Sequence, residues 1–67
     1  MFVLIYDIPV SETTLKVYVN RKLRRIGAIP IQKSVWKHSS LEKLFGIALA
    51  IKNSGGKASI LEEKFIF

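Results

Sequence analysis

The sequence contains no cysteine, only one histidine and two prolines, and five acidic residues in 67 positions. Without cysteine the chain forms no disulfide, and one histidine cannot build the cysteine and histidine sets of structural zinc sites. The longest apolar run, residues 44–51, contains Gly46 and is far shorter than the ~20 residues that span a bilayer. A chain of this size buries only ~60% of the surface that its unfolded form exposes, so its core is small. With disulfides and zinc excluded, we expect association into a homodimer to supply the missing stability.

Basic and apolar residues are abundant by contrast. Eleven lysines and arginines against five acids give a net charge of +6, and 49% of the residues are hydrophobic. That apolar content excludes intrinsic disorder, because disordered chains lack the side chains needed to form a core. No basic segment precedes the N-terminal apolar run, and Asp7 and Pro9 interrupt it, which argues against a secretory signal. We expect one domain over residues 1–67, in the cytoplasm and without a membrane partner.

The first half of the sequence predicts a strand and a helix. Residues 2–6 form a continuous apolar run, typical of a central strand that is buried on both faces. Ser11 is a favourable N-cap, so a helix is expected over residues 12–26, ending at Gly27. On a helical wheel the apolar residues form one stripe and the basic residues gather on the opposite side. The apolar stripe consists of Leu15, Val19, Leu23 and Ile26.

The second half predicts a strand pair and a second helix. Residues 28–37 alternate as in a strand or a bent strand pair, with Pro30 at an edge or a bulge. The spacing of Ser39 and Glu42 is that of a capping box and predicts a helix over residues 40–53, closed by the glycine pair that follows. This helix is apolar around most of its circumference, so we expect a neighbouring subunit to cover part of it.

Residues 57–67 predict the last strand, which ends in three apolar side chains. The order of strand, helix, strand pair, helix and strand is the ferredoxin-like βαββαβ pattern. We therefore predict an α+β sandwich with two helices on one face of an antiparallel sheet. The apolar C-terminal residues are expected to pack at the sheet of the partner subunit.

Seven of the eleven basic residues fall within 22 positions, on the first predicted helix and on the strand region that follows it. They are Lys16, Arg21, Lys22, Arg24, Arg25, Lys33 and Lys37. Such a patch predicts contact with nucleic-acid phosphates regardless of base sequence, because counterion release drives that binding. A solvated helix face is the alternative explanation. Neither aromatic interleaving nor a base-reading motif supports sequence-specific recognition.

Asp7 stands at the carboxyl end of the predicted central strand, where sheets of this kind commonly bind ligands. Either it contacts a ligand or it caps the turn at Pro9. A single aspartate is a poor Mg²⁺ site, whereas two copies of Asp7 facing each other across a dimer would form a better one. A catalytic triad with Ser34 and His38 is rejected, because Ser34 lacks a nucleophile elbow and nothing orients His38. We expect His38 at the surface.

Three separated segments carry a resemblance to a known family. They are Leu4-Ile5-Tyr6-Asp7-Ile8-Pro9, Leu23-Arg24-Arg25-Ile26-Gly27-Ala28 and Ile31-Gln32-Lys33-Ser34-Val35-Trp36. In this order the segments resemble the Cas two family of small CRISPR-associated ferredoxin-fold proteins. The same signature is similar to the C-terminal domain of phenylacetate-type transcriptional repressors. The resemblance covers residues 2–37, and the rest of the chain matches by topology.

The resemblance implies a homodimer of packed sheets, duplex nucleic acid along the basic surfaces, and a divalent metal such as Mg²⁺ held by Asp7. Asp7 and Ser34 are the positions that match the family's motif. Family members bridge DNA without catalysis beside the integrase subunit in spacer acquisition, a step of antiviral defence, and have also been assigned metal-dependent endonuclease activity. We therefore expect a dimeric scaffold that binds duplex DNA or RNA. The alternatives are a Mg²⁺-dependent endonuclease (endoribonuclease) with paired catalytic Asp7 residues, and a regulatory interaction domain.

Overall fold

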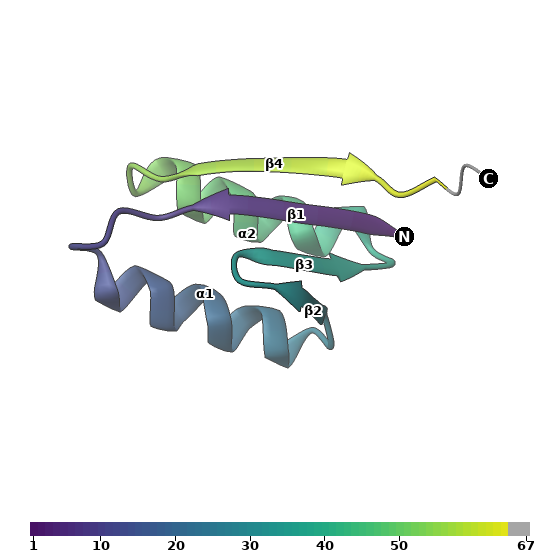
Figure 1. Ribbon diagram of the computed structural model, residues 1–67, viewed down its shortest axis with the longest axis horizontal. Helices are drawn as coiled ribbons and strands as arrows, with labels where there is room; N and C mark the ends of the chain where they lie inside the picture. The colour runs from purple at the N-terminus through teal and green to yellow at the C-terminus, as the bar shows by residue number, and fades with distance from the viewer. Residues whose placement is uncertain (65–67) are drawn as a thin grey trace.

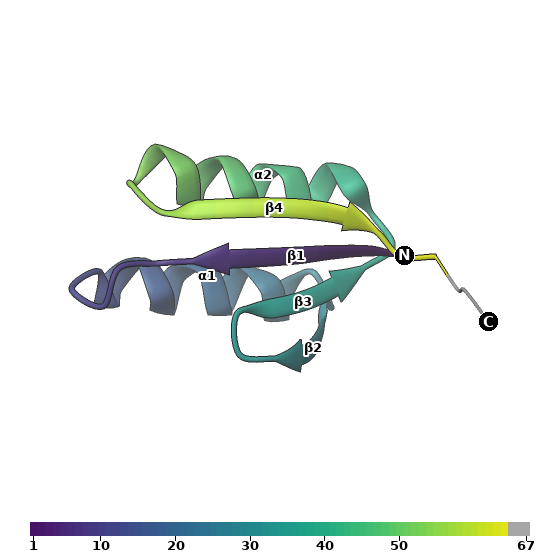
Figure 2. The same cartoon turned by 45° about the horizontal axis from the view of Figure 1, so that its top comes forward.

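The computed structural model describes residues 1–64 and contains four strands and two helices in that range. In chain order they are β1 (Phe2–Asp7), α1 (Thr13–Arg25), β2 (Ile29–Gln32), β3 (Val35–His38), α2 (Leu41–Asn53) and β4 (Lys57–Glu62). The strands form one antiparallel sheet in the order β2-β3-β1-β4 (Figure 1). Both helices lie on the same face of this sheet, α2 behind β4 and α1 behind β1 (Figure 2). The predicted ferredoxin-like fold is confirmed.

The core lies between the helices and one face of the sheet. Alternate residues of a strand point to opposite faces, and Leu4 of β1 is directed at the helices with no exposed surface. The predicted apolar stripe of α1 is confirmed, since Val19 and Leu23 are fully buried. The buried apolar residues are Leu4, Ile8, Val19, Leu23, Trp36, Leu44, Ile47, Ala48 and Ile51.

The opposite face of the sheet, which we call the open face, is covered by no element within residues 1–64. Its apolar side chains follow from the strand register and are Val3, Ile5, Ile29, Val35 and Leu61. Ile5 is 40% exposed and Leu61 is 54% exposed. The expectation that the first strand is buried on both faces is therefore wrong for the single chain. Its central position, between β3 and β4, is confirmed.

The ends of α1 differ in how well the sequence predicted them. The helix begins at Thr13, and its N-cap position is Glu12, which forms no side-chain capping bond. Ser11 does not cap, because the Glu12 N–H donates to the Pro9 carbonyl at 2.9 Å and Ser11 lies inside that turn. The predicted stop is confirmed. Gly27 has a φ of +79° in a closing turn of the Schellman type, a conformation that glycine adopts without strain.

The N-cap of α2 is Ser40, whose Oγ accepts a hydrogen bond from the Lys43 N–H at 3.2 Å. The predicted capping box from Ser39 to Glu42 is therefore one residue out of register. Glu42 still lies in the first turn of the helix, where its charge complements the helix dipole. At the other end Gly55, with a φ of +90°, closes α2 as predicted.

His38 fixes this register, because both of its ring nitrogens are engaged. The Ser40 N–H donates to Nδ1 at 2.8 Å, so Nε2 carries the proton and donates to the Ile26 carbonyl at 2.7 Å. The half-buried ring thus joins the C-terminus of α1 to the start of α2. His38 is half-buried, so the expected surface position holds only in part, and its role is structural.

Two close contacts lie at the ends of the β1–β4 pair. A side chain at Gly56 would lie 2.7 Å from Cγ2 of Ile51 and 3.0 Å from the Asp7 carbonyl, so only glycine fits there. At the other end of the strand pair the Glu63 N–H donates to the Met1 carbonyl at 2.9 Å. Residues 65–67, predicted to extend the last strand and to pack at a partner, lie outside the described residues.

The β2–β3 hairpin forms the other edge of the sheet. Pro30 lies on the edge strand β2 beside a register irregularity, as predicted. The turn contains Ser34 with a φ of +63°, and its carbonyl accepts a hydrogen bond from the Tyr6 N–H at 3.1 Å.

Among the described residues, neither helix has the length and apolar character needed to cross a membrane.

Candidate nucleic-acid interface

Helix α1 carries five of the seven predicted phosphate-binding residues and no acidic residue. Three of its cations, Lys22, Arg24 and Arg25, lie in the last turn. Positive charge there interacts favourably with the carbonyl end of the helix dipole, so the helix tolerates this concentration of like charge. The result is a strongly cationic element packed against a neutral core.

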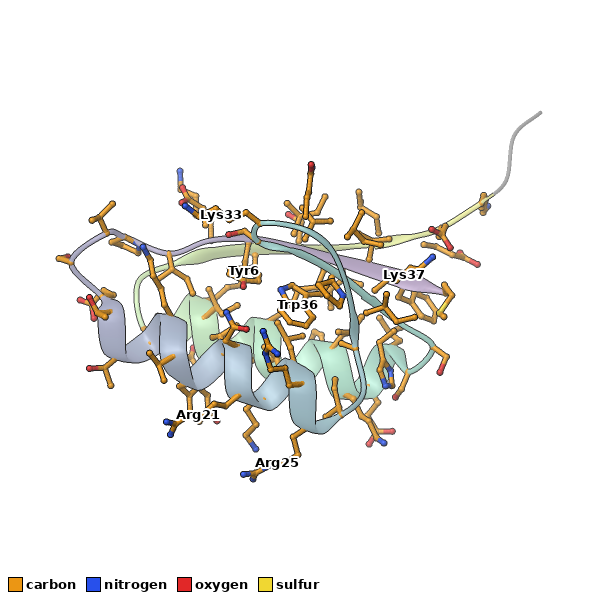
Figure 3. The ribbon with its side chains drawn as sticks, turned by 60° about the horizontal axis from the view of Figure 1, so that its bottom comes forward. Tyr6, Arg21, Arg25, Lys33, Trp36 and Lys37 are labelled. Atoms are coloured by element: carbon orange, nitrogen blue, oxygen red, sulfur yellow. The ribbon has the colours of Figure 1, made fainter. Side chains whose placement is uncertain are left out.

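The basic side chains of α1 occupy different parts of the helix surface that the core leaves uncovered. Because Val19 and Leu23 point inward, Arg21 and Arg25 lie on the far side of the helix and point away from the sheet (Figure 3). We call this surface the outer face of α1. Lys16 and Arg24 border Arg21 in a shallow groove along α1 and also line the pocket beside the β2–β3 hairpin, so they lie between the outer face and the hairpin.

Lys22 occupies a third position, on the flank of α1 that faces α2. Its Nζ lies 5.9 Å from the centre of the Tyr18 ring, within the range of a cation–π interaction. The side chain is half-buried, unlike those of Arg21 and Arg25, which are exposed. Lys22 is therefore less available than Arg21 and Arg25 for contact with a ligand.

The two predicted lysines outside α1 are separated from it. Lys33 lies at the exposed tip of the β2–β3 hairpin (Figure 3). Lys37 lies on the open face, where its Nζ is 3.9 Å from Oε2 of Glu63. This is the one salt bridge among residues 1–64, so the α1 cations have no carboxylate partner within that range. The seven basic residues thus occupy several surfaces rather than one.

Asp7 ends β1 on the open face and is exposed. Lys57 lies directly opposite it on β4, so a positive charge already stands beside the carboxylate. No group of three or more potential metal ligands occurs among the described residues. One carboxylate beside a lysine does not fit Mg²⁺, which prefers several oxygen ligands. A Mg²⁺ site would need Asp7 from a second chain, and it stays a prediction.

The structure separates the residues of the rejected triad. Ser34 lies in the turn before β3, whereas His38 ends that strand and pairs with Phe2 at the other end of β1 from Asp7. Both ring nitrogens of His38 are already occupied by backbone groups. His38 can therefore act on neither Ser34 nor Asp7, which both lie at the opposite end of β1.

A pocket of about 470 Å³, which was not predicted from the sequence, lies between α1 and the β2–β3 hairpin. Lys16 and Arg24 were predicted, but as phosphate contacts of a basic patch and not as the wall of a pocket. The residues missed are Tyr6, Asn20 and Trp36, which line the same pocket. A signal was present, because Lys16, Asn20 and Arg24 recur at a spacing of four on one side of the helix.

Comparison of this chain with protein-family models, with curated proteins and with solved structures finds no match. The ferredoxin-like fold hosts many unrelated functions, so it does not identify one here. A functional assignment must therefore rest on the placement of particular side chains.

Proposed function

We propose that this chain is a homodimeric protein that binds duplex nucleic acid without sequence preference. In keeping with its resemblance to the Cas two family, we propose that it acts in CRISPR spacer acquisition as a scaffold beside the integrase subunit. The observation that carries the proposal is the outer face of α1, from which Arg21 and Arg25 project away from the sheet (Figure 3).

The outer face of α1 suits phosphate contacts. Arginine binds phosphate oxygens through a planar fork of donors, and each neutralised phosphate releases counterions that favour binding. Arg21 and Arg25 are exposed and lie one helical turn apart, so both can reach the same backbone. Such contacts are independent of base sequence.

The open face supports the dimer. It presents apolar side chains from all four strands. A second copy of the chain is the partner we expect there, because the small core of one copy needs additional buried apolar surface. The helices cover the opposite face of the sheet (Figure 2). A dimer formed through the open face would therefore leave both copies of α1 on its outside, free to contact nucleic acid. It would also leave α2 outside, so the cover by a neighbouring subunit that the sequence suggested for this helix is not part of the proposed dimer.

Duplex binding by charge-matched variants tests this function. The double variant Arg21→Gln/Arg25→Gln removes two charges from the outer face, and Lys43→Gln/Lys52→Gln removes two exposed charges from α2. Binding of a 20-base-pair duplex should weaken with salt, with a log–log slope of about −0.9 per phosphate contact. The arginine double variant should lower affinity and flatten that slope, while the lysine double variant keeps the wild-type slope.

Two results would contradict the proposal. Equal losses in both double variants would show that net charge, rather than the outer face of α1, drives the binding. Wild-type protein that binds no duplex at low salt would exclude the scaffold altogether. Cleavage of RNA or DNA in Mg²⁺ that disappears in Asp7→Asn, with the dimer intact, would replace the scaffold by the endonuclease alternative.

A further inference from the structure

The pocket between α1 and the β2–β3 hairpin has two polar walls. One wall is the row of Lys16, Asn20 and Arg24 along α1, and the other is the hairpin turn with Lys33 and Ser34. Its volume of about 470 Å³ lies within the ~300–1,000 Å³ of typical ligand sites. Because the walls come from two elements packed on one core, the pocket is part of the fold and does not depend on a partner.

The charged side chains around this pocket favour an anionic ligand. Three basic residues, Lys16, Arg24 and Lys33, line the pocket, and the one acid that borders it, Asp7, belongs to the open face at the end of β1. Nε of Arg24 donates to Oδ1 of Asn20 at 3.3 Å, which restrains the guanidinium along the wall. A neutral amide restrains the arginine without cancelling its charge. The remaining guanidinium donors can still bind a phosphate group.

The floor of the pocket is aromatic. Tyr6 and Trp36 lie between α1 and the strands (Figure 3). Trp36 is 5% exposed and forms the base of the pocket, whereas Tyr6 is half-buried and retains accessible surface. Aromatic side chains of this kind offer a flat surface on which any nucleobase can stack.

The hairpin wall also contains strained backbone. Ser34 adopts a φ of +63°, a region that residues other than glycine seldom occupy. The hydrogen bond from the Tyr6 N–H to the Ser34 carbonyl, 3.1 Å long, holds this turn against β1. Backbone strain of this kind clusters at ligand sites, and here it places a serine, with its hydroxyl, in the pocket wall.

We propose that this pocket binds one nucleotide, with its phosphate at Lys16 and Arg24 and its base against Tyr6. The nucleotide is either a free nucleoside monophosphate or the 5′-phosphorylated end of a single strand. The site differs in position from the duplex surface proposed above, because Arg24 lines the pocket and Arg25, on the outer face of α1, does not. Duplex binding and nucleotide binding can therefore fail independently.

Intrinsic fluorescence provides the assay, because Trp36 is the only tryptophan of the chain and lines the pocket. The full chain is titrated with AMP, adenosine, inorganic phosphate, and a five-residue deoxyadenosine strand with or without its 5′-phosphate. Calorimetry repeats each titration. The variant is Arg24→Gln, and its matched control is Arg25→Gln, which removes the same charge from the outer face one residue along the helix.

Wild-type protein should bind AMP or the 5′-phosphorylated strand more tightly than adenosine, phosphate or the unphosphorylated strand. Arg24→Gln should weaken this binding about tenfold or more, the usual effect of losing a charge-assisted hydrogen bond, and Arg25→Gln should not. Whichever phosphorylated probe binds more tightly identifies the source of the nucleotide. Arg24 is exposed, so both variants should keep the wild-type circular dichroism spectrum.

Three results would overturn the nucleotide site. Binding of inorganic phosphate as tightly as AMP would leave no role for the aromatic floor. Equal losses of affinity in Arg24→Gln and Arg25→Gln would show that net charge, and not the pocket, determines the binding. If the protein binds duplex DNA but none of the phosphorylated probes, the pocket is not a nucleotide site. The proposed function would be unaffected by that result.

Discussion

Ile5→Glu should dissociate the proposed homodimer. Ile5 lies in the central strand on the open face, opposite Val35 of β3, and is 40% exposed in the single chain. Full burial of an isoleucine contributes ~1.5–3 kcal/mol, so burying its remaining surface in a dimer contributes about 1 kcal/mol. A glutamate at that position would also place an unpaired carboxylate in an apolar interface, at a cost of several kcal/mol.

Twofold symmetry repeats this change in both subunits. The dissociation constant should therefore rise at least ~100-fold, which corresponds to about 2.8 kcal/mol. Sedimentation equilibrium over a range of micromolar concentrations measures it. The control is Val10→Glu, the same kind of substitution at a residue that is 86% exposed in the loop before α1. A wild-type chain that stays monomeric, or an Ile5→Glu variant that dimerises like Val10→Glu, would refute the role of the open face.

Three further outcomes test the fold and the metal. His38→Ala removes both hydrogen bonds between the helix ends and should lower the free energy of unfolding by about 1–3 kcal/mol in urea titrations; an unchanged midpoint would contradict this role. Gly56→Ala should lower the melting temperature, because its Cβ would meet the Asp7 carbonyl at 3.0 Å, and a variant as stable as wild type would contradict that contact. Mg²⁺ should raise the melting temperature weakly in wild type, more in Lys57→Ala and not at all in Asp7→Asn, as binding to the folded state requires. Equal responses in all three proteins would exclude Asp7 as a ligand.

The fold was predictable because its local signals agree. Each helix ends at a glycine with positive φ, Gly27 or Gly55, and each carries an apolar stripe that packs on the sheet. The order of elements then restricts the topology to a few arrangements. The first strand was harder to interpret. An apolar run such as residues 2–6 has the same pattern whether its second face meets its own chain or another one, so burial on that face could not be assigned.

The candidate sites were only partly predictable, because they depend on directions that spacing does not give. A helical wheel separates the basic residues of α1 from its core, but it does not show that Arg24, and not Arg21, lines the pocket beside the hairpin. The cap of α2 shifted by one residue because Ser39 and Ser40 are equally able to cap. Nδ1 of His38 accepts a hydrogen bond from the Ser40 N–H and so favours Ser40 as the cap, a contact that no sequence pattern encodes.

The backbone bond between Glu63 and Met1 has a mechanical consequence. It brings both ends of the described chain to the same end of the β1–β4 pair, so tension applied through residues 1 and 64 acts across the two strands rather than along them. Interstrand hydrogen bonds then carry the load one at a time, starting with the Glu63–Met1 bond and continuing where Phe2 faces Glu62. Single-molecule pulling from these ends should therefore separate β1 from β4 bond by bond and open the domain at low force. Since β1 is the central strand, the first few bonds to break would already uncover Leu4.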